Sequence, residues 1–311
     1  MRKTDMTNLS YAFIGLGHLG GCLAASLVRN GFSVTVFDRD PAAVARLVAL
    51  GATAASSPAN AAAKAGNAIT CLPSPKISEA VLTGPDGLLA GLPEGATWIE
   101  MSTNGRDEIV RLAALASAKS VETLECPVTG GVHLAASGKI TALVGGDPDL
   151  YERHHAAIDA MCAKSFLMGP LGSAAVIKVI TNMLAFIHLV AAGEALMLAK
   201  KGSLDLAQSF HAIAASSGNS FVHETESQLV LNGSYDIGFT MDLALKDLGF
   251  ALGMGEKFGV PLDLASRVNA IFEQGKSAYG GDAWSTQIVK LLEDATGSDL
   301  RAPGFPAKLE A

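Results

Sequence analysis

The sequence predicts an α/β fold class: an N-terminal doubly wound parallel sheet, then an all-helical C-terminal domain, joined by a long interdomain helix. Three observations predict it. Residues 10–150 alternate short β-rich runs with alanine-rich helical ones, one helical pattern runs unbroken from residue 173 to 201, and only helical patterns follow it. Strands separated by helices of about 10 to 15 residues imply βαβ units, and therefore a parallel sheet with helices on both faces.

The elements of the first half follow in chain order. Apolar, β-branched runs bounded by turn residues predict strands, which are expected at 11–15, 33–38, 68–73, 96–102, 121–128 and 140–146. Alanine-rich runs bounded by Gly or Pro predict helices, which are expected at 19–31, 41–51 and 105–119.

From Gly172 onward this alternation stops. Ser173 is the expected N-cap of the long helix, and Gly202 ends it after two lysines in the last turn. Further helices are expected at 205–218, 240–259, 262–280 and 281–297. The predicted domains are therefore 1–172 and 173–311, with the tail after Pro303 expected to fray.

Composition narrows the class of protein. A chain of 311 residues with 49% apolar and 17% charged residues suits two packed domains with extensive subunit contact. A net charge of −7 without a Lys/Arg-rich block argues against a nucleic-acid partner. The four cysteines are widely spaced and form no CxxC pair, so we expect reduced thiols and no metal site.

The apolar run 177–199 is not interpreted as a membrane span. Lys178, Asn182, His188 and Glu194 interrupt it, and four such side chains cannot all avoid the hydrocarbon of a bilayer. We therefore expect a soluble, cytoplasmic protein. A lysine and an asparagine four residues apart at the start of an apolar helix need a different explanation.

The stretch "FIGLGHLGG" places a Gly-x-Gly-x-x-Gly motif between a strand and a helix, and the next strand ends in Asp38, 18 residues beyond Gly20. This is the Rossmann arrangement, in which the glycines let backbone N–H groups approach a pyrophosphate. Asp38 would bind the adenosine ribose and repel a 2′-phosphate, so NAD is favoured, while Arg39 keeps NADP as the alternative. The expected contacts are Gly15, Leu16, Gly17, His18, Leu19, Gly20, Asp38 and Arg39.

Several further stretches carry a resemblance. In order along the chain these are the Gly-rich segment, "CLP", "MST", "ECPVTGGVHLAASGKIT", "GSAAVIKVITNML" and "FTMDLALKDLGFAL". Their order and spacing resemble those of the β-hydroxyacid dehydrogenases, the group that contains 3-hydroxyisobutyrate dehydrogenase, tartronate semialdehyde reductase and, more distantly, 6-phosphogluconate dehydrogenase. The resemblance covers residues 11 to about 300.

The resemblance implies a substrate site in "CPVTGG". There the family holds the acid group of its substrate, a role that falls on Thr129, Gly130 and Gly131. One hydroxyl and two backbone amides free of side chains also suit a carboxylate chemically. His133 stands where small residues are common in the family. It either lies beside the substrate and tunes specificity or is a solvated loop histidine.

Lys178 and Asn182 match the family's catalytic lysine and its partner asparagine in "KVITN". Four residues apart, they share one helix face. Oxidation of a hydroxy acid requires a base for the hydroxyl proton. A lysine serves if its pKa falls from about 10.4 toward neutrality, at a cost of about 4 kcal/mol. Desolvation and a nearby second cation, for which Lys246 is the candidate, would both lower it.

The resemblance also implies residues around the nicotinamide. Lys246 would face cofactor or substrate, Asp247 would position it, and Phe239 would line the site. Leu72 and Pro73 would pack on the nicotinamide, and Thr103 of "MST" would lie near both ligands. Met101 and the residues after Asn104 depart from the family's Ser-Ser-Thr and following proline, which weakens the assignment of Thr103.

The leading hypothesis is an NAD-dependent oxidoreductase that interconverts a small 3-hydroxy acid, such as 3-hydroxyisobutyrate, and its semialdehyde, with a lysine as general acid and base. One alternative is a reductase of tartronate semialdehyde or a sulfonated analogue. Another is a non-catalytic nucleotide-sensing or chromatin-reading protein, against which the retained Lys178 and Asn182 argue. The family also implies a homodimer or homotetramer. The substrate's side group would depend on His133, Asn219 and Ser220.

Overall fold

The computed structural model describes residues 9–310. It divides into two compact units: the first ends at Lys178 and the second runs from Val179 to Glu310. The division falls inside one unbroken helix, α8 (Ser173–Lys201), which ends at the expected Lys201 and begins at Ser173, the residue expected as its N-cap.

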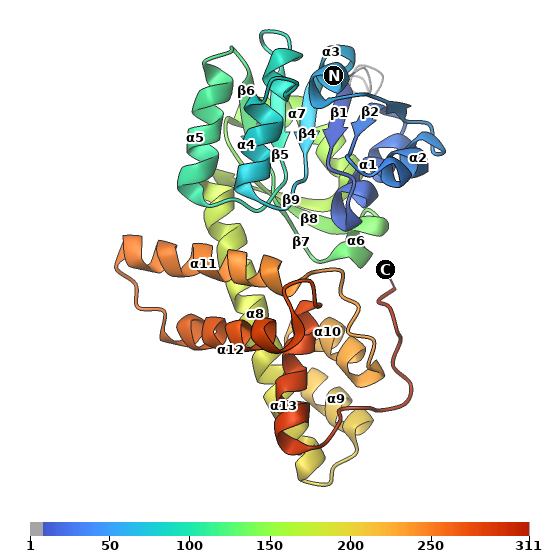
Figure 1. The fold of residues 1–311 in the computed structure, drawn as a ribbon, viewed down its shortest axis with the longest axis vertical. Coiled ribbons are helices and arrows are strands. Elements are labelled where there is room, and N and C mark those ends of the chain that lie inside the picture. The colour runs from blue at the N-terminus through green and yellow to red at the C-terminus, as the bar shows by residue number, and fades with distance from the viewer. Residues whose placement is uncertain (1–8, 311) are drawn as a thin grey trace. The chain divides into compact units, whose positions relative to one another are not determined.

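The first unit is built on a mixed sheet (Figure 1). Its strands, in spatial order, run β3-β2-β1-β4-β5-β6-β8-β7, and β9 pairs with β8. The bounds are β1 Ser10–Ile14, β2 Ser33–Phe37, β3 Thr53–Ala54, β4 Gly66–Thr70, β5 Thr97–Glu100, β6 Glu122–Glu125, β7 Val128–Thr129, β8 Ile140–Gly145 and β9 Cys162–Gly169. Strands β1 to β6 pair with one another in parallel, as expected.

The predicted parallel sheet carries an antiparallel addition beyond β6. Strand β8 pairs antiparallel with both β6 and β7. The 14 residues between β6 and β8, 126–139, form β7 and the short helix α6 rather than a crossover to a parallel strand, and β7 pairs directly with β8. The chain therefore reverses at this edge, and the "TGG" motif lies in the reversal.

Helices cover both faces of the sheet, as predicted. Along β1, Tyr11 and Phe13 point into one core and Ala12 and Ile14 into the other, the two-residue alternation of a strand. The first core also contains residues of α1 (His18–Arg29), α2 (Pro41–Val48), α6 (Val132–Ala136) and α7 (Pro148–Met161). The second contains residues of α3 (Pro58–Ala65), α4 (Pro75–Thr83), the 3-10 turn η2 (Leu88–Ala90) and α5 (Arg106–Ser117).

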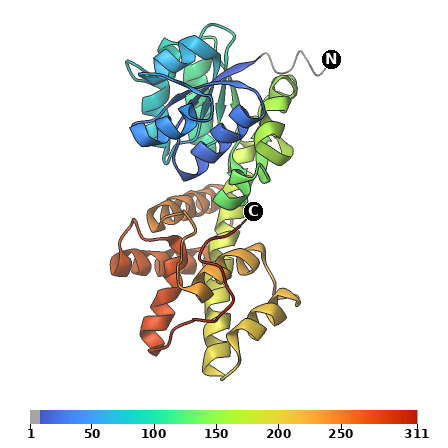
Figure 2. The same ribbon diagram turned by 90° about the vertical axis from the view of Figure 1, so that its right-hand side faces the viewer.

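The second unit is all-helical. Figure 2 shows α8 running through it, with α11 and α12 on one side and α9 and α10 on the other. The bounds are α9 Leu206–Ala214, α10 Phe221–Asn232, α11 Met241–Phe258, α12 Asp263–Tyr279, the 3-10 turn η3 Ser285–Val289 and α13 Lys290–Thr296.

Two helix predictions in this unit need correction. The helix expected at 281–297 begins only at Ser285, because Trp284 forms a β-bridge with Thr240 and the Ser285 N–H donates to the Phe239 carbonyl. Helix α10 was not predicted, since its apolar residues alternate irregularly with charged ones. Ser220 is its N-cap and accepts the His223 N–H.

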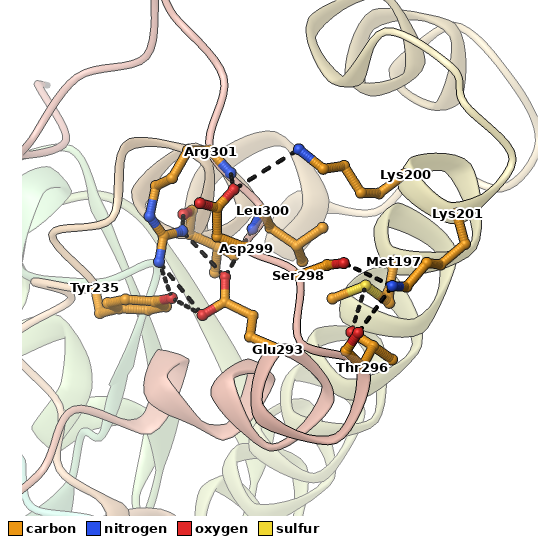
Figure 3. Close-up of polar contacts among 11 residues, drawn as sticks. Met197, Lys200, Lys201, Tyr235, Glu293, Thr296, Ser298, Asp299, Leu300 and Arg301 are labelled. Atoms are coloured by element: carbon orange, nitrogen blue, oxygen red, sulfur yellow. Dashed lines mark hydrogen bonds and ion pairs between the residues drawn. The ribbon is translucent and has the colours of Figure 1, made fainter.

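The tail after Pro303 is held in place, contrary to expectation. Asn232 donates its amide to the Phe305 carbonyl at 2.8 Å, and the Phe305 ring packs edge-on against Phe210. Just before it, Arg301 donates to the Tyr235 hydroxyl at 2.5 Å, and that hydroxyl donates to the buried Glu293 carboxylate at 2.6 Å (Figure 3). This network fixes the end of the chain to α10 and α13.

Helix α8 is long and apolar enough to cross a membrane by length and composition, and it is the one such helix within residues 9–310. Its most apolar window is 33% buried, and Leu198 is 76% exposed. Much of its apolar surface is thus uncovered in a single chain.

Candidate active site

The Gly-rich turn after β1 depends on its glycines. Gly15 has a φ of +94°, and a Cβ there would lie 2.3 Å from the Cys71 carbonyl oxygen. A Cβ on Gly20 would lie 2.1 Å from the Gly15 carbonyl oxygen. A Cβ on Gly17 would meet only open space, and no side chain caps α1 there. The first N–H groups of α1 therefore open onto a cavity without side chains in front of them.

That cavity is a pocket of about 690 Å³. Asp38 lines it and is fixed by two backbone N–H groups, from Leu16 at 2.6 Å and from Asp40 at 2.8 Å. Of the predicted cofactor contacts, Leu16, Gly17, His18 and Asp38 line this pocket. The basic residues on its wall are Arg29 and Arg46, and not the predicted Arg39.

The loops that follow β4 and β5 are joined by a buried carboxyl group. Glu100 is 1% exposed and accepts hydrogen bonds from the Ser102 N–H at 3.0 Å and the Asn104 side chain at 3.2 Å. It also pairs with Thr70, whose hydroxyl accepts from the Trp98 indole at 2.8 Å. Burial raises the pKa of the Glu100 carboxyl despite these donors.

This network brings the predicted nicotinamide residues together. The Leu72 N–H donates to the Ser102 hydroxyl at 2.8 Å, so the loop carrying Leu72 and Pro73 lies against the loop carrying Thr103. Burial raises the pKa of the Cys71 thiol, directly after β4, to about 12. The neighbouring Glu100 and Cys22 add to that effect, and the charge of Lys178 opposes it. Lys178 itself is 8% exposed.

The "TGG" motif lies at the end of the short strand β7. Gly130 and Gly131 have φ of +126° and +90°, values that favour glycine, and helix α6 begins directly after them without a side-chain cap. The His133 imidazole lies over this turn: a Cβ on Gly131 would be 3.1 Å from two of its ring atoms. Burial lowers the pKa of His133. The His133 ring thus lies over the "TGG" motif itself. The sequence alone does not distinguish this position from that of a solvated loop histidine.

In the helical unit, Asp247 holds two of the predicted residues. Its carboxylate is fully buried, accepts the Asn182 amide at 2.6 Å and forms an ion pair with Lys246 at 2.9 Å. The Lys246 ammonium also lies 5.2 Å from the centre of the Phe250 ring. Phe239 stacks on Phe186 of α8. The predicted Asp-Lys pair is therefore a three-residue cluster with Asn182, on α8 and α11.

Asn219 and Ser220 serve a local purpose in the structure. Ser220 caps α10, and Asn219 accepts the Ser220 N–H at 2.8 Å and donates to Glu224 at 2.5 Å. Within the part of the chain that the structure describes, no cluster of His, Cys, Asp and Glu could hold a metal ion.

The comparison with known proteins identifies the family. Residues 10–169 match the sequence profile "NAD binding domain of 6-phosphogluconate dehydrogenase", and residues 172–292 match "NAD-binding of NADP-dependent 3-hydroxyisobutyrate dehydrogenase". The chain is also 31% identical over 291 residues to 2-(hydroxymethyl)glutarate dehydrogenase of Eubacterium barkeri, which covers 93% of this chain and 97% of that one. The chain belongs to the β-hydroxyacid dehydrogenase family.

Other members of the family are similar at the same level. 3-Hydroxyisobutyrate dehydrogenase of Pseudomonas aeruginosa is 33% identical over 268 residues, 84% of this chain and 90% of that one. The structure of 3-hydroxyisobutyrate dehydrogenase of Mycobacterium tuberculosis with L-serine has a TM-score of 0.81 at 28% identity and covers 91% of this chain and 99% of that one.

NAD fits the first unit of this hydroxyacid dehydrogenase. The uncapped start of α1 and the open face of Gly17 suit a pyrophosphate, and Asp38 stands where a ribose hydroxyl can bond to it. NADP is not excluded, since Arg29 and Arg46 are on the same wall.

Sequence reasoning missed two buried carboxyl groups of this dehydrogenase. Glu100 ties the two loops that are predicted to contact the nicotinamide, and Glu125 accepts backbone N–H groups at the start of α8. The signal in each case was an acid at the carboxyl end of an apolar strand, where an unpaired charge would be costly to bury.

Proposed function

We propose that this protein catalyses the NAD-dependent oxidation of a small 3-hydroxy acid to its semialdehyde, and the reverse reduction. One observation supports the proposal: Lys178 is largely buried and its charge acts on the Cys71 thiol directly after β4, in the unit that also holds the nucleotide pocket and the "TGG" turn. Ligands of open α/β sheets bind at the carboxyl ends of the strands.

Each residue then has a defined part. Thr129, Gly130 and Gly131 would hold the substrate carboxylate through a hydroxyl and exposed backbone N–H groups. Lys178 would accept the hydroxyl proton at Nζ during oxidation and return it to the carbonyl oxygen during reduction. Bound NAD supplies the hydride acceptor for the carbon that carries the hydroxyl.

Asn182 would orient the hydroxyl group and the lysine. It lies one helical turn beyond Lys178 on α8, and Asp247 fixes its amide group. Asp247 accepts from the Asn182 nitrogen, which fixes the orientation of the amide group, and the amide oxygen, as an acceptor, suits a donor such as the lysine ammonium or the substrate hydroxyl. The Asp247 carboxylate also forms an ion pair with Lys246, so this one carboxylate holds both Asn182 and Lys246.

The names of the relatives suggest the substrate class. 2-(Hydroxymethyl)glutarate, 3-hydroxyisobutyrate and L-serine share one skeleton: a CH₂OH group and a carboxylate on the same carbon, which also carries a variable substituent. We propose that this protein acts on such a 2-substituted 3-hydroxypropanoate. The carboxylate would bind at "TGG", and the CH₂OH group would meet Lys178.

NAD is the proposed cofactor in preference to NADP. Asp38 and Asp40 both line the pocket, and two carboxylates there would repel a 2′-phosphate. Reduction of a semialdehyde is the same reaction in reverse, so a reductase role uses the same residues. Which direction dominates depends on the supply of substrate.

We further propose a soluble, cytoplasmic homodimer or homotetramer. The uncovered apolar surface of α8 suits burial against a second copy of the chain, as in obligate interfaces, which resemble divided cores. Leu184 and Leu198 of α8 and Leu204 beyond it are exposed and would lie in such an interface.

The proposal is tested with Lys178→Ala. Absorbance of NADH is followed with a panel of 2-substituted 3-hydroxypropanoates, and the best substrate is then used with the variant. We expect turnover to fall by about a thousandfold or more, since general acid–base catalysis contributes up to about 10⁴-fold. Near-normal turnover with unchanged NADH binding would show that Lys178 is not the base. No turnover of any substrate by the wild-type protein would instead favour a nucleotide sensor.

A further inference from the structure

The first turn of α8 is capped by a side chain from a different part of the chain. An α-helix leaves its first N–H groups without partners inside the helix. Here the Gly172 and Ala174 N–H groups donate to one oxygen of Glu125, at 2.6 and 2.8 Å, and the Ala175 N–H donates to the other at 3.3 Å. Ser173, the expected N-cap, is instead the first helical residue, and its N–H donates to the Pro170 carbonyl.

The Glu125 carboxyl group is built into the sheet edge rather than placed at the surface. The residue is 1% exposed. Its backbone pairs with that of Gly145 on the neighbouring strand β8. A Cβ at position 145 would lie 2.1 Å from the Glu125 Oε1 atom, so only glycine leaves room for the carboxylate. Burial raises the pKa of Glu125, while the three N–H groups and the nearby Arg106 oppose that effect.

Glu125 therefore connects two parts of the proposed site. It is the last residue of β6, four residues before Thr129, so it fixes the strand that leads into the "TGG" turn. Lys178 follows Ala174 by four residues, one helical turn or about 6 Å along the axis, on the same side of the helix. One carboxylate thus sets the start of the lysine's helix against the strand that carries the carboxylate-binding turn.

We propose that Glu125 is a positioning residue that sets Lys178 in register with Thr129, Gly130 and Gly131. This inference rests on the proposed function of Lys178. It gives Glu125 no contact with substrate or cofactor. Its effect is on the distance between the base and the hydroxyl group, and a displacement of about 1 Å at such a site can cost about a hundredfold in rate.

The experiment uses two substitutions that disturb the cap in different ways. Glu125→Gln replaces one accepting oxygen by an NH₂ group that opposes the helix N–H groups. Gly145→Ala keeps the carboxylate but pushes it off its position. Asp147→Asn is the matched control, because Asp147 also caps a helix of the first unit, α7, through one carboxylate oxygen, and that helix carries none of the proposed catalytic residues.

We expect both Glu125→Gln and Gly145→Ala to lower kcat tenfold to a hundredfold, with the Kd for NADH changed less than twofold. NADH-binding stoichiometry gives the fraction of folded sites, so unfolded protein cannot account for the loss. Deuterium on the carbon that carries the hydroxyl should give a larger isotope effect on kcat in both variants, because a misplaced base makes the chemical step limiting. Asp147→Asn should change neither quantity.

Hydrogen exchange at residues 172–178 reports whether the cap has been disturbed. Faster exchange there with kcat within threefold of wild type in both variants would overturn the inference. If Glu125→Gln fails to fold, Gly145→Ala carries the test with the same outcomes. If kcat falls in Lys178→Ala but not in Glu125→Gln or Gly145→Ala, the positioning role of Glu125 is refuted and the proposed function is not. Full turnover in Lys178→Ala refutes the proposed function, and the inference falls with it.

Discussion

The histidine buried beneath the sheet makes the stability of the first unit depend on pH. His154 of α7 is 1% exposed. Its Nδ1 lies 2.8 Å from the Tyr11 hydroxyl and its Nε2 lies 2.8 Å from the Thr97 hydroxyl. A neutral imidazole can accept from one hydroxyl and donate to the other, whereas a protonated one can only donate. Burial, with a smaller effect of Arg153, lowers the pKa of His154 from 6.5 to about 4.

The sign and size of the effect follow from linkage. The folded pKa is below the unfolded one, so the unfolded chain binds more protons between pH 6.5 and pH 4. The contribution of His154 to stability is therefore complete above pH 6.5 and is lost as the pH falls toward 4. The full difference corresponds to about 3 kcal/mol at 1.36 kcal/mol per pH unit, and about 2 kcal/mol of it is lost between pH 7.5 and pH 5.

The assay compares urea unfolding of the wild-type protein and His154→Gln at pH 7.5 and at pH 5, by a probe of the first unit. We expect the stability difference between the two proteins to shrink by about 2 kcal/mol at the lower pH. His155→Gln is the control: its side chain is partly exposed on the same helix, and the substitution should leave the wild-type pH dependence in place. An equal difference between wild type and His154→Gln at both pH values would refute the reasoning.

Two further predictions concern specificity. Asp38→Ala should raise the KM for NAD by tenfold to a hundredfold and narrow the preference for NAD over NADP, because charged hydrogen bonds to the ribose are worth about 1.5 to 3 kcal/mol each. Steady-state kinetics with both nucleotides measures this, with Asp147→Asn, which changes a carboxylate outside the pocket lining, as the control; unchanged KM values would contradict the role. His133→Ala should raise kcat/KM about tenfold for substrates with larger groups on the carbon next to the carboxylate, because the imidazole lies over Gly131. An unchanged substrate ranking would place that ring outside the substrate pocket.

The parts of the fold predicted from the sequence are those with local causes. The Gly-rich turn is one, because the spacing of its glycines is set within one strand, one turn and one helix, although the turn also packs against Cys71. The ends of α8 are another, since Gly172 and Gly202 bound an unbroken helical pattern. The spacing of Lys178 and Asn182 likewise fixes their shared face of that helix without any tertiary information.

The parts that were missed have causes distant in sequence. The cap of α8 comes from Glu125, about 50 residues earlier, and no local pattern at Ser173 could reveal it. Strand β8 returns antiparallel because the chain reverses at the "TGG" motif. The residues of that motif do not by themselves show whether the chain reverses there or crosses over to a parallel strand. The tail after Pro303 looked free because the partners that hold it, Phe210 and Asn232, are about 70 or more residues away.

The hydrogen bond from the Trp98 indole to Thr70 makes the fluorescence of Trp98 a reporter of the loops that are predicted to contact the nicotinamide. Trp98 is fully buried, and its N–H group reaches the Glu100 carboxyl through a single hydroxyl. Indole emission responds to charge near the ring, so a change at Glu100 would alter the Trp98 spectrum without any added dye. The second tryptophan, Trp284, lies in the helical unit. A variant that keeps only Trp98 would therefore report the state of the sheet edge alone.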